Sequence, residues 1–489
     1  MSRSVVLGLC LLAGARAAPE KDLVTSLPGF PGPFPFKLYS GYLDVPGPVA
    51  GYDSLKIHYE FHTSMNDPTK DPVCTWHQGG PGGSSLYGAY GEMGYLNVAQ
   101  ENGNLSYHVN KYSWNQVANM LYLESPAGSD DPIGFSSCYQ GGKMPSVCEW
   151  NDKTQAEAYA HTLRAFYAAF PEFKSNKLYL SGESYAGQYI PNIATYLVEN
   201  MEKEIPLTGI LVGNGCWGGD ANNVNCNGPN SEQNDLDMYF GKGLISKPAY
   251  EGVYARCKFP LTGMPGLNCT IALEKAFNEV GPHNVYDIYD NCPQTAEFLK
   301  RSGKSMRWFL NFMRSKMGSS HAQVNAELQE LGGGGYDWLC GGLPGLATYM
   351  SSKDVQTALH LDAPITNRFN YDTSGPASIT LYPNLVKKIR VLIYNGDADA
   401  CVPYKGNEEW TEGLAAQGIV TQNKAWHPWF AQGQSGVPAG YATSYNVPYS
   451  SGPSDFTFIT IRLAGHMVPQ FQPAAALSFF KQFMSERPF

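Results

Sequence analysis

A serine, two aspartates and a histidine that could act together on a substrate each lie just after an apolar run of this sequence. Ser184 is at the centre of the segment 182–187, which reads G-E-S-Y-A-G and follows the apolar run 177–181. A strand that enters a turn similar to Gly-x-Ser-x-Gly and continues into a helix holds the serine in a strained backbone conformation and exposes its hydroxyl. The flanking glycines let the strand and the helix approach closely. We therefore expect Ser184 to be a nucleophile.

A serine hydroxyl is a weak nucleophile unless a base accepts its proton and an acid orients that base. The run 390–395 leads into Asp397 and Asp399, and the run 456–463 leads into His466. Side chains at the carboxyl ends of parallel strands meet at one edge of an α/β sheet. A single aspartate or histidine in a loop is usually structural. The chain order Ser, Asp, His at three strand ends, however, is that of an α/β-hydrolase and predicts a catalytic triad.

Strands and helices that alternate along the chain are expected to position these residues. The apolar patterns predict further strands at 42–45, 55–61, 74–76, 120–123, 178–180 and 210–212, a crossover helix at 153–170 and a closing helix at 473–484. The predicted fold class is α/β, an α/β-hydrolase with a central mixed, mostly parallel sheet.

An inserted helical cap is expected at 216–345, where the chain becomes rich in Cys, Gly and Asn. The core then consists of a first part, 18–215, and a second part, 346–489. The four glycines at 332–335 are expected to form a loop, because no lysine follows them as in a phosphate-binding loop.

Five segments of the chain resemble motifs of the serine carboxypeptidase family, of the carboxypeptidase Y and cathepsin A type, and they occur in the family's order. They are 76–85 (W-H-Q-G-G-P-G-G-S-S), 114–128 (W-N-Q-V-A-N-M-L-Y-L-E-S-P-A-G), 182–187 (G-E-S-Y-A-G), 396–403 (G-D-A-D-A-C-V-P) and 465–469 (G-H-M-V-P). Five matches in order are far more specific than any one of them. The resemblance implies a secreted or vacuolar exopeptidase on an α/β-hydrolase fold.

The resemblance implies catalytic roles position by position. Ser184 corresponds to the family's nucleophile, His466 to its base and Asp399 to the acid that orients the base, which leaves Asp397 as a turn residue. The backbone N–H groups of Gly80 and Tyr185 are implied to form the oxyanion hole, in which each donor is worth roughly 10²–10³ in turnover. Position 467, a methionine (Met467), resembles the site beside the leaving residue, so we expect an apolar preference there.

A clamp for the substrate carboxylate is implied beside the nucleophile. Glu183 corresponds to the glutamate that binds the free C-terminal carboxylate, Gly79 adds its N–H, and Glu92 resembles a second glutamate that supports these hydrogen bonds. Two carboxylates in contact cannot both be ionised, so a shared proton should tighten binding in acid. Gln78 replaces the family's asparagine and keeps the amide donor on a chain one methylene longer. Trp76 corresponds to a tryptophan lining the clamp, although core packing would also account for it.

Two further departures from the family lie near the mouth of the expected site. Residues 129–133 (S-D-D-P-I) are inserted before 134–136, where the family continues directly. This insertion could reshape access to the site. Gly83 stands where the family often has a disulfide-bonded cysteine.

The N-terminal segment and the glycosylation acceptors of the sequence indicate the secretory pathway. The chain has 489 residues, a net charge of −9 and no Lys/Arg-rich stretch, so nucleic-acid binding lacks electrostatic support. Residues 1–17 have the positive end, apolar segment and small-residue cleavage site of a signal peptide. Asn104 and Asn268 begin N-x-S/T glycosylation acceptors. No later apolar run is long enough to span a bilayer. We expect the vacuole or lysosome, or the extracellular space.

The cysteines agree with this route. Eleven occur, and ten remain without the signal peptide, an even number that indicates disulfides. Short spacing favours the pairs Cys138–Cys148 and Cys216–Cys226, and the pairing of the others stays open; these are Cys257, Cys269, Cys292 and Cys340. Cys74 and Cys401 are expected to be buried thiols. Neither C-x-x-C nor H-E-x-x-H spacing occurs, so we expect no metal and no cofactor.

The sequence thus predicts a serine-type carboxypeptidase, a hydrolase and exopeptidase that releases C-terminal residues by acyl-enzyme hydrolysis, favoured at acidic pH. Its partners would be peptide and protein C-termini, with no nucleic acid and no membrane insertion, and a homodimer is compatible with the sequence. Two alternatives stay open. One is an acyltransferase or cyanohydrin lyase on the same scaffold, which Glu183 disfavours because those substrates carry no peptide carboxylate. The other is a protective subunit that binds lumenal enzymes.

Overall fold

The computed structural model describes most of the chain. The described ranges are 18–101, 104–128, 134–222, 224–261, 264–290, 299–300, 302–315, 344–362, 368–433, 436–448 and 455–489. The expected signal peptide, the insertion 129–133, the glycine run 332–335 and the cysteines at 292 and 340 lie outside the described residues.

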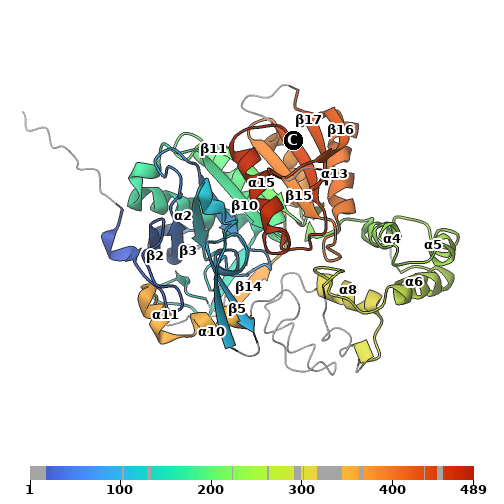
Figure 1. Cartoon of the computed structure of the whole chain (residues 1–489), viewed down its shortest axis with the longest axis horizontal. Coiled ribbons are helices and arrows are strands. Elements are labelled where there is room, and N and C mark those ends of the chain that lie inside the picture. Colours follow the sequence, from blue (N-terminus) through green and yellow to red (C-terminus); the bar gives the residue numbers. More distant parts are fainter. Residues whose placement is uncertain are drawn as a thin grey trace, which may run out of the picture.

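A mixed sheet, twelve-stranded within the described residues, forms the centre of the molecule (Figure 1). Its six central strands are parallel and follow one another in the order β7 (Asn119–Leu123), β4 (Val73–His77), β10 (Leu178–Glu183), β11 (Leu207–Gly213), β15 (Arg390–Gly396) and β18 (Phe456–Ile461). Antiparallel strands flank them, with β3 (Tyr52–His62), β2 (Leu38–Val49), β1 (Leu23–Val24) and β8 (Ser137–Tyr139) on one side and β17 (Gly440–Asn446) and β16 (Thr421–Trp429) on the other. The predicted fold class is confirmed, and within this sheet the parallel pairing is confined to the six central strands.

Helices cover both faces of this sheet because successive residues of each central strand point to opposite sides. In β15, Val391 and Ile393 pack into one apolar cluster, and Leu392 and Tyr394 pack into the other. The first cluster includes side chains of α2 (Asp152–Ala169), α3 (Ala186–Tyr196), α12 (Tyr382–Leu385) and α13 (Tyr404–Ala416). The second includes side chains of α1 (Leu86–Gly91), α10 (Pro344–Met350), α11 (Lys353–Ala358) and α15 (Pro473–Met484). The helices predicted at 153–170 and 473–484 are therefore confirmed.

A separate helical unit projects from one side of the sheet (Figure 1). It consists of α4 (Ser231–Gly241), α5 (Lys247–Tyr254), α6 (Leu267–Val280) and α8 (Met306–Ser315). Leu236, Leu273 and Phe277 belong to a third apolar cluster, which also includes Ala400 of the core. This unit falls within the range 216–345, for which the sequence predicts a cap.

Smaller elements complete the described fold. They are η1 (Glu20–Asp22), the hairpin β5 (Leu96–Glu101) and β6 (Asn104–Val109), the parallel pair β9 (Val147–Asn151) and β14 (Arg368–Asp372), the pair β12 (Gly218–Gly219) and β13 (Val224–Asn225), the π-helix η4 (Leu197–Met201), the short 3-10 helices η2 (Trp114–Gln116), η3 (Pro171–Phe173) and η5 (Ser378–Thr380), and α14 (Val468–Phe471). Helix α10 packs against β5, although the two are far apart in the sequence.

Three disulfides lie within the described residues. Cys138–Cys148 and Cys216–Cys226 confirm the pairs favoured by spacing, and Cys257–Cys269 joins the segment after α5 to α6. Cys74 is a buried free thiol, as predicted, and Cys401 is buried as well. In the described part of the chain, no helix combines the length and apolar character needed to cross a membrane.

Candidate active site

Ser184 occupies the tight turn between β10 and α3. Its φ of +61° lies in the left-handed region, which a residue with a Cβ adopts only under constraint. Its N–H donates to the carbonyl oxygen of Gly213 over 3.0 Å, and its carbonyl oxygen accepts from the N–H groups of Gly187 and Cys216, each over 2.9 Å. A Cβ on Gly187 would lie 2.4 Å from the carbonyl oxygen of Cys216. The turn therefore has the strain and the close approach expected of a nucleophile elbow.

Asp399 and His466 are joined by a hydrogen bond of 2.7 Å between Oδ2 and Nδ1. Asp399 follows β15, His466 follows β18, and both side chains are buried. A carboxylate oxygen accepts hydrogen bonds, so Nδ1–H is the donor in this contact, and in the neutral imidazole Nε2 then keeps its lone pair. The imidazole is thereby oriented to accept a proton at Nε2.

Asn214 links the turn at Ser184 to Asp399. It follows β11, which lies between β10 and β15 in the sheet. Its Nδ2 donates to Asp399 Oδ2 over 2.7 Å, and Gly396 N donates to its Oδ1 over 3.1 Å. Cys401 N donates to the other oxygen of Asp399 over 2.8 Å. Sequence reasoning missed Asn214, although a polar residue between two glycines at the end of a central strand is a signal that could have found it.

The loop after β4 lies directly against Ser184. A Cβ on Gly79 would lie 2.5 Å from Ser184 Cβ and 2.7 Å from Tyr185 N. Gly80, the next residue, has a φ of +117°, a conformation that favours glycine. Among the described residues, the N–H groups of Gly80 and Tyr185 donate to no protein acceptor. Both are therefore available to bind an oxyanion.

A buried pair of carboxyl groups lies beside the nucleophile turn. Glu183 directly precedes Ser184, Glu92 follows α1, and the two are 1% and 3% exposed. Gln78 Nε2 donates to Glu183 Oε1 over 2.7 Å, while Trp76 Nε1 donates to Gln78 Oε1 over 2.9 Å. Because an indole N–H can only donate, Trp76 fixes which end of the amide faces Glu183. Glu183 Oε2 and both Glu92 oxygens lack a well-aligned donor among the described residues.

Burial raises the pKa of both carboxyl groups. Desolvation is the largest cause at Glu183 and at Glu92, and repulsion by Glu92 raises the pKa of Glu183 further, while the hydrogen bond from Gln78 opposes the rise. Two interacting carboxyl groups relieve their repulsion by sharing one proton. The pair therefore keeps a proton to a higher pH than an exposed carboxyl group would. In that state the pair carries an O–H that can donate a hydrogen bond to an acceptor.

Two other predicted residues lie close to His466 in the sequence or the fold. Met467 directly follows it and is buried. Asp397 accepts from Leu463 N over 2.8 Å and forms an ion pair of 2.9 Å with Lys242. Both oxygens of Asp397 are thus used in holding loops, whereas Asp399 faces the imidazole.

Asp152, which the sequence did not single out, anchors the far side of the nucleophile turn. Its carboxylate accepts from Tyr185 Oη over 2.9 Å, from Tyr371 Oη over 3.0 Å and from Gly375 N over 2.9 Å. Tyr185 immediately follows the nucleophile, so these bonds restrain the residue whose N–H faces the site. Since these partners of Asp152 come from segments far apart in the chain, no local sequence pattern predicts this hydrogen-bonded cluster.

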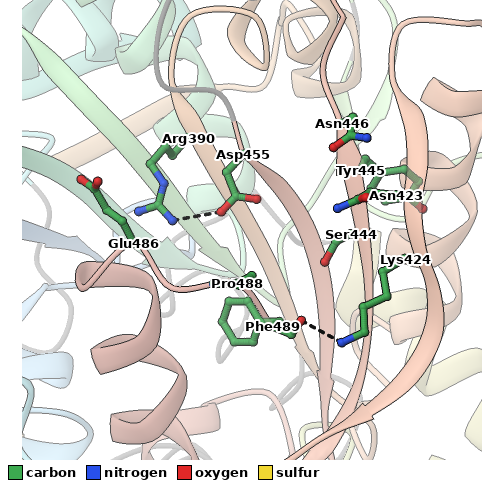
Figure 2. Close-up of a pocket in the computed structure, with 10 residues that line it drawn as sticks. All are labelled: Arg390, Asn423, Lys424, Ser444, Tyr445, Asn446, Asp455, Glu486, Pro488 and Phe489. Carbon is green, nitrogen blue, oxygen red and sulfur yellow. Dashed lines mark hydrogen bonds and ion pairs between the residues drawn. The ribbon is translucent and has the colours of Figure 1, made fainter.

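A cavity of about 380 Å³ lies at the opposite end of the central strands. Figure 2 shows the residues that line it. Arg390, at the start of β15, donates to Asp455 over 2.9 Å, and Lys424 donates to the carbonyl oxygen of Phe489 over 3.1 Å. The cavity contains none of the candidate site residues, and these cations already have protein partners. Across the described ranges, no three His, Cys, Asp or Glu side chains are grouped so that they could hold a metal ion.

Comparison with known proteins decides the family. The serine carboxypeptidase family model matches residues 28–486. The chain belongs to the serine carboxypeptidase family. Among curated members, "Serine carboxypeptidase-like 20" of Arabidopsis thaliana is 30% identical over 96% of this chain and 94% of that protein, and the "Lysosomal protective protein" of Mus musculus is 31% identical over 99% of each. The predicted family and the predicted enzyme class, a serine-type carboxypeptidase hydrolase, are confirmed.

A solved structure agrees with this membership at the level of the fold. The crystal structure of a prohormone-processing carboxypeptidase from Saccharomyces cerevisiae superposes with a TM-score of 0.60 and 20% identity, and the match covers 96% of this chain and 95% of that one. The similarity in fold thus extends over nearly the whole length of both chains.

Proposed function

We propose that this enzyme removes single residues from the C-termini of peptides and proteins, and that it does so best in acid. The observation that carries the proposal is the buried carboxyl pair Glu183–Glu92 next to Ser184. An ester without a free carboxylate has no group to share the pair's proton. A peptide C-terminus has one, and the Gln78 amide that donates to Glu183 holds that carboxyl group in place for it.

The proposed reaction begins when Ser184 Oγ attacks the carbonyl carbon of the last peptide bond and His466 Nε2 accepts the hydroxyl proton. The carbonyl oxygen takes up the electron pair and is stabilised by the N–H groups of Gly80 and Tyr185. The C–N bond then breaks, and His466 returns the proton to the leaving amine. Water attacks the acyl-enzyme by the same route. Asp399 holds the imidazole and stabilises its protonated form.

Acidic pH should favour substrate binding because the carboxyl pair must hold a proton when a third carboxylate arrives. As the pH rises through the raised pKa of the pair, both groups ionise and repel the substrate. KM for a free acid should therefore rise with pH, while KM for a C-terminal amide should not. This dependence of KM on pH would arise from ionisation of the carboxyl pair and not from proton transfer at His466.

We also propose that residues 216–345 act as a cap that shapes the entrance. Tyr286 comes from this region, its ring lies 5.1 Å from that of His466 and its carbonyl oxygen accepts from His466 N over 2.7 Å. Ala400 N, next to Asp399, donates to the carbonyl oxygen of Val285 over 3.0 Å. The segment 285–286 thus contacts both the loop that contains His466 and the loop that contains Asp399. In this arrangement Met467 would line the pocket of the leaving residue. The cellular location of the enzyme would be the secretory pathway.

The test compares a blocked dipeptide with its C-terminal amide between pH 4 and 8, with Ser184→Ala as the inactive control. A preference for the free acid that grows as pH falls supports the proposal. Equal rates on acid and amide would reject it in favour of a general peptidase or esterase. Acyl transfer to an added alcohol without release of free acid would point to an acyltransferase. Partner binding that survives in Ser184→Ala would reveal a protective role.

A further inference from the structure

Gly82 connects the loop of Gly80, a proposed oxyanion donor, to two aromatic side chains. Gly82 N donates to the hydroxyl oxygen of Tyr189 over 3.1 Å. A Cβ added to Gly82 would lie 2.7 Å from Cε1 of Phe369, so that ring holds the loop from a second direction. Gly80 in turn lies close to Gly82, because a Cβ on Gly80 would lie 2.8 Å from Gly82 N. A shift of Gly82 would therefore move the Gly80 donor as well.

Tyr189 also contacts Tyr185, whose N–H is the second proposed donor. Tyr189 N donates to the carbonyl oxygen of Tyr185 over 3.3 Å, and the two rings meet edge to face with centroids 5.1 Å apart. Tyr189 belongs to α3, the helix that follows the turn at Ser184, so it is placed directly with respect to the nucleophile. One residue thus touches both halves of the proposed oxyanion hole.

The Tyr189 ring has little freedom to move. His77 stacks on it with centroids 4.2 Å apart, and the Tyr371 ring meets it edge to face with centroids 5.7 Å apart. Atoms in a close-packed interior cannot shift without straining their neighbours. Donors that are fixed before the reaction stabilise a developing charge best, because they need no reorganisation at that moment. The Tyr189 ring is therefore a rigid support against which both donors can be placed.

We propose that Tyr189 and Phe369 are positioning residues for the oxyanion hole. Together they fix Gly82, and through it the Gly80 N–H. Tyr189 also restrains Tyr185, so the spacing of the two donors depends on one side chain. The inference rests on the proposed function and adds to it side chains that act on the oxyanion through the backbone. Tyr189 is fully buried and therefore does not contact the substrate itself.

Tyr189→Phe tests the proposal because it removes the acceptor for Gly82 N and keeps the ring. The Gly80 donor should then shift, while the ring contact with Tyr185 remains. With a blocked dipeptide as substrate, kcat should fall about tenfold and KM should change by less than about twofold, because the oxyanion forms only after the serine has attacked. Steady-state kinetics measures this split.

A trifluoromethyl ketone in place of the carboxyl group of a blocked amino acid gives a second readout. Ser184 Oγ adds to the ketone carbon, the hydroxyl proton passes to His466, and the carbonyl oxygen takes the electron pair and becomes an oxyanion. In Tyr189→Phe, Ki for the ketone should rise about tenfold, in parallel with the fall in kcat. The corresponding alcohol has no carbonyl and forms no adduct, so its Ki should change by less than about twofold.

Tyr52→Phe is the matched control. The Tyr52 hydroxyl oxygen also accepts from a backbone N–H, that of Glu149 over 2.6 Å, and Tyr52 is buried as well. Neither residue belongs to the candidate site, so this variant should lose stability and keep kcat and both Ki values. An equal fall of kcat in the two variants would overturn the proposal, and so would equal rises in Ki for the ketone and the alcohol.

Phe369→Leu is an independent test, and it decides the question if Tyr189→Phe does not fold. Leucine is shorter than phenylalanine, so Gly82 should loosen and Ki for the ketone should rise about threefold, with no rise for the alcohol. An unchanged Ki for the ketone would overturn the proposal. If the unaltered enzyme shows no preference for the free acid over the amide, the proposed function fails separately. The ketone test stays valid in that case, because every acyl transfer to Ser184 passes through the same oxyanion.

Discussion

Asn214 donates a hydrogen bond of 2.7 Å from Nδ2 to Oδ2 of Asp399, the oxygen that also faces the imidazole. Asn214 has a φ of +43°, a region that asparagine tolerates better than most residues. Its Oδ1 accepts from Gly396 N over 3.1 Å, so the amide cannot rotate without losing a bond at each end. The orientation of Asp399 therefore depends on a neighbouring strand end as well as on its own loop.

Asn214→Ala is expected to lower kcat about tenfold or more with little change in KM, because in the proposed mechanism a mispositioned Asp399 weakens His466 as a base and leaves the proposed carboxylate clamp untouched. Steady-state kinetics on the blocked dipeptide measures this split. The control is Asn176→Ala, which removes a buried amide that donates to Pro68 and Asp71 far from the site. The control should lose stability and keep kcat, and an equal loss of kcat in both variants would contradict the role of Asn214.

Glu92→Gln is expected to move the rise of KM for the free acid to lower pH. Repulsion by Glu92 contributes to the raised pKa of Glu183, and an uncharged amide removes it, so Glu183 ionises earlier. KM measured from pH 4 to 8 on the free acid reports the shift, with the amide substrate as the internal control. An unchanged profile would show that the two groups do not share a proton.

The same carboxyl pair should make stability depend on pH. Between the ordinary carboxyl pKa and the raised pKa of the pair, the native protein binds more protons than the unfolded chain, so the free energy of unfolding falls as pH rises. Removing one group with Glu92→Gln should flatten this slope. Urea unfolding at several pH values between 4 and 8 measures it, and a slope as steep as that of the unaltered protein would speak against the pair as its source.

The Cys257–Cys269 disulfide should stabilise the projecting helical unit locally. It closes a loop with a sequence separation of 12, and such short loops contribute roughly 3 kcal/mol in the chain-entropy model. Replacing both cysteines by alanine is expected to speed limited proteolysis of α5 and α6 while the core keeps its melting temperature. Cys138 and Cys148, whose separation is 10, lie in the core. Replacing them should lower the melting temperature of the core and leave the proteolysis of α5 and α6 unchanged. Equal proteolysis of the two variants would refute local stabilisation.

The sequence predicted the elements of the core well because their signals are local. The apolar run before Ser184 and the glycines around it define a strand, a turn and a helix within a few residues, and the helix at 473–484 begins and ends where its periodicity does. Contacts between strand ends depend on the order of strands in the sheet, which no local pattern contains. Asn214 became meaningful only when β11 was found between β10 and β15. The parallel pair β9 and β14 was missed for the same reason, since its strands lie far apart in the chain.

His77 is a further residue that only the structure explains. It is fully buried and stacks on Tyr189 with ring centroids 4.2 Å apart, and burial lowers the pKa of His77 to about 4. Its Nδ1 lies 2.8 Å from the carbonyl oxygen of Gln78, and Gln155 Nε2 lies 2.9 Å from its Nε2. A neutral ring satisfies both contacts only if Nδ1–H donates to Gln78 and Nε2 accepts from Gln155.

Because the carbonyl of Gln78 and the N–H of Gly79 belong to one planar peptide, the bond from His77 also fixes the direction of that N–H. His77→Leu removes the donor and is expected to raise KM for the free acid about tenfold, whereas His77→Asn, whose amide can donate to the same carbonyl, should lose less. Kinetics on the acid and the amide separates this effect from general damage. Gln155→Ala is the control: it leaves the Nδ1–H donor in place, so it should cost stability without changing KM. If His77→Asn is no better than His77→Leu, or if Gln155→Ala raises KM as much, then the ring acts by filling space and not by holding the peptide.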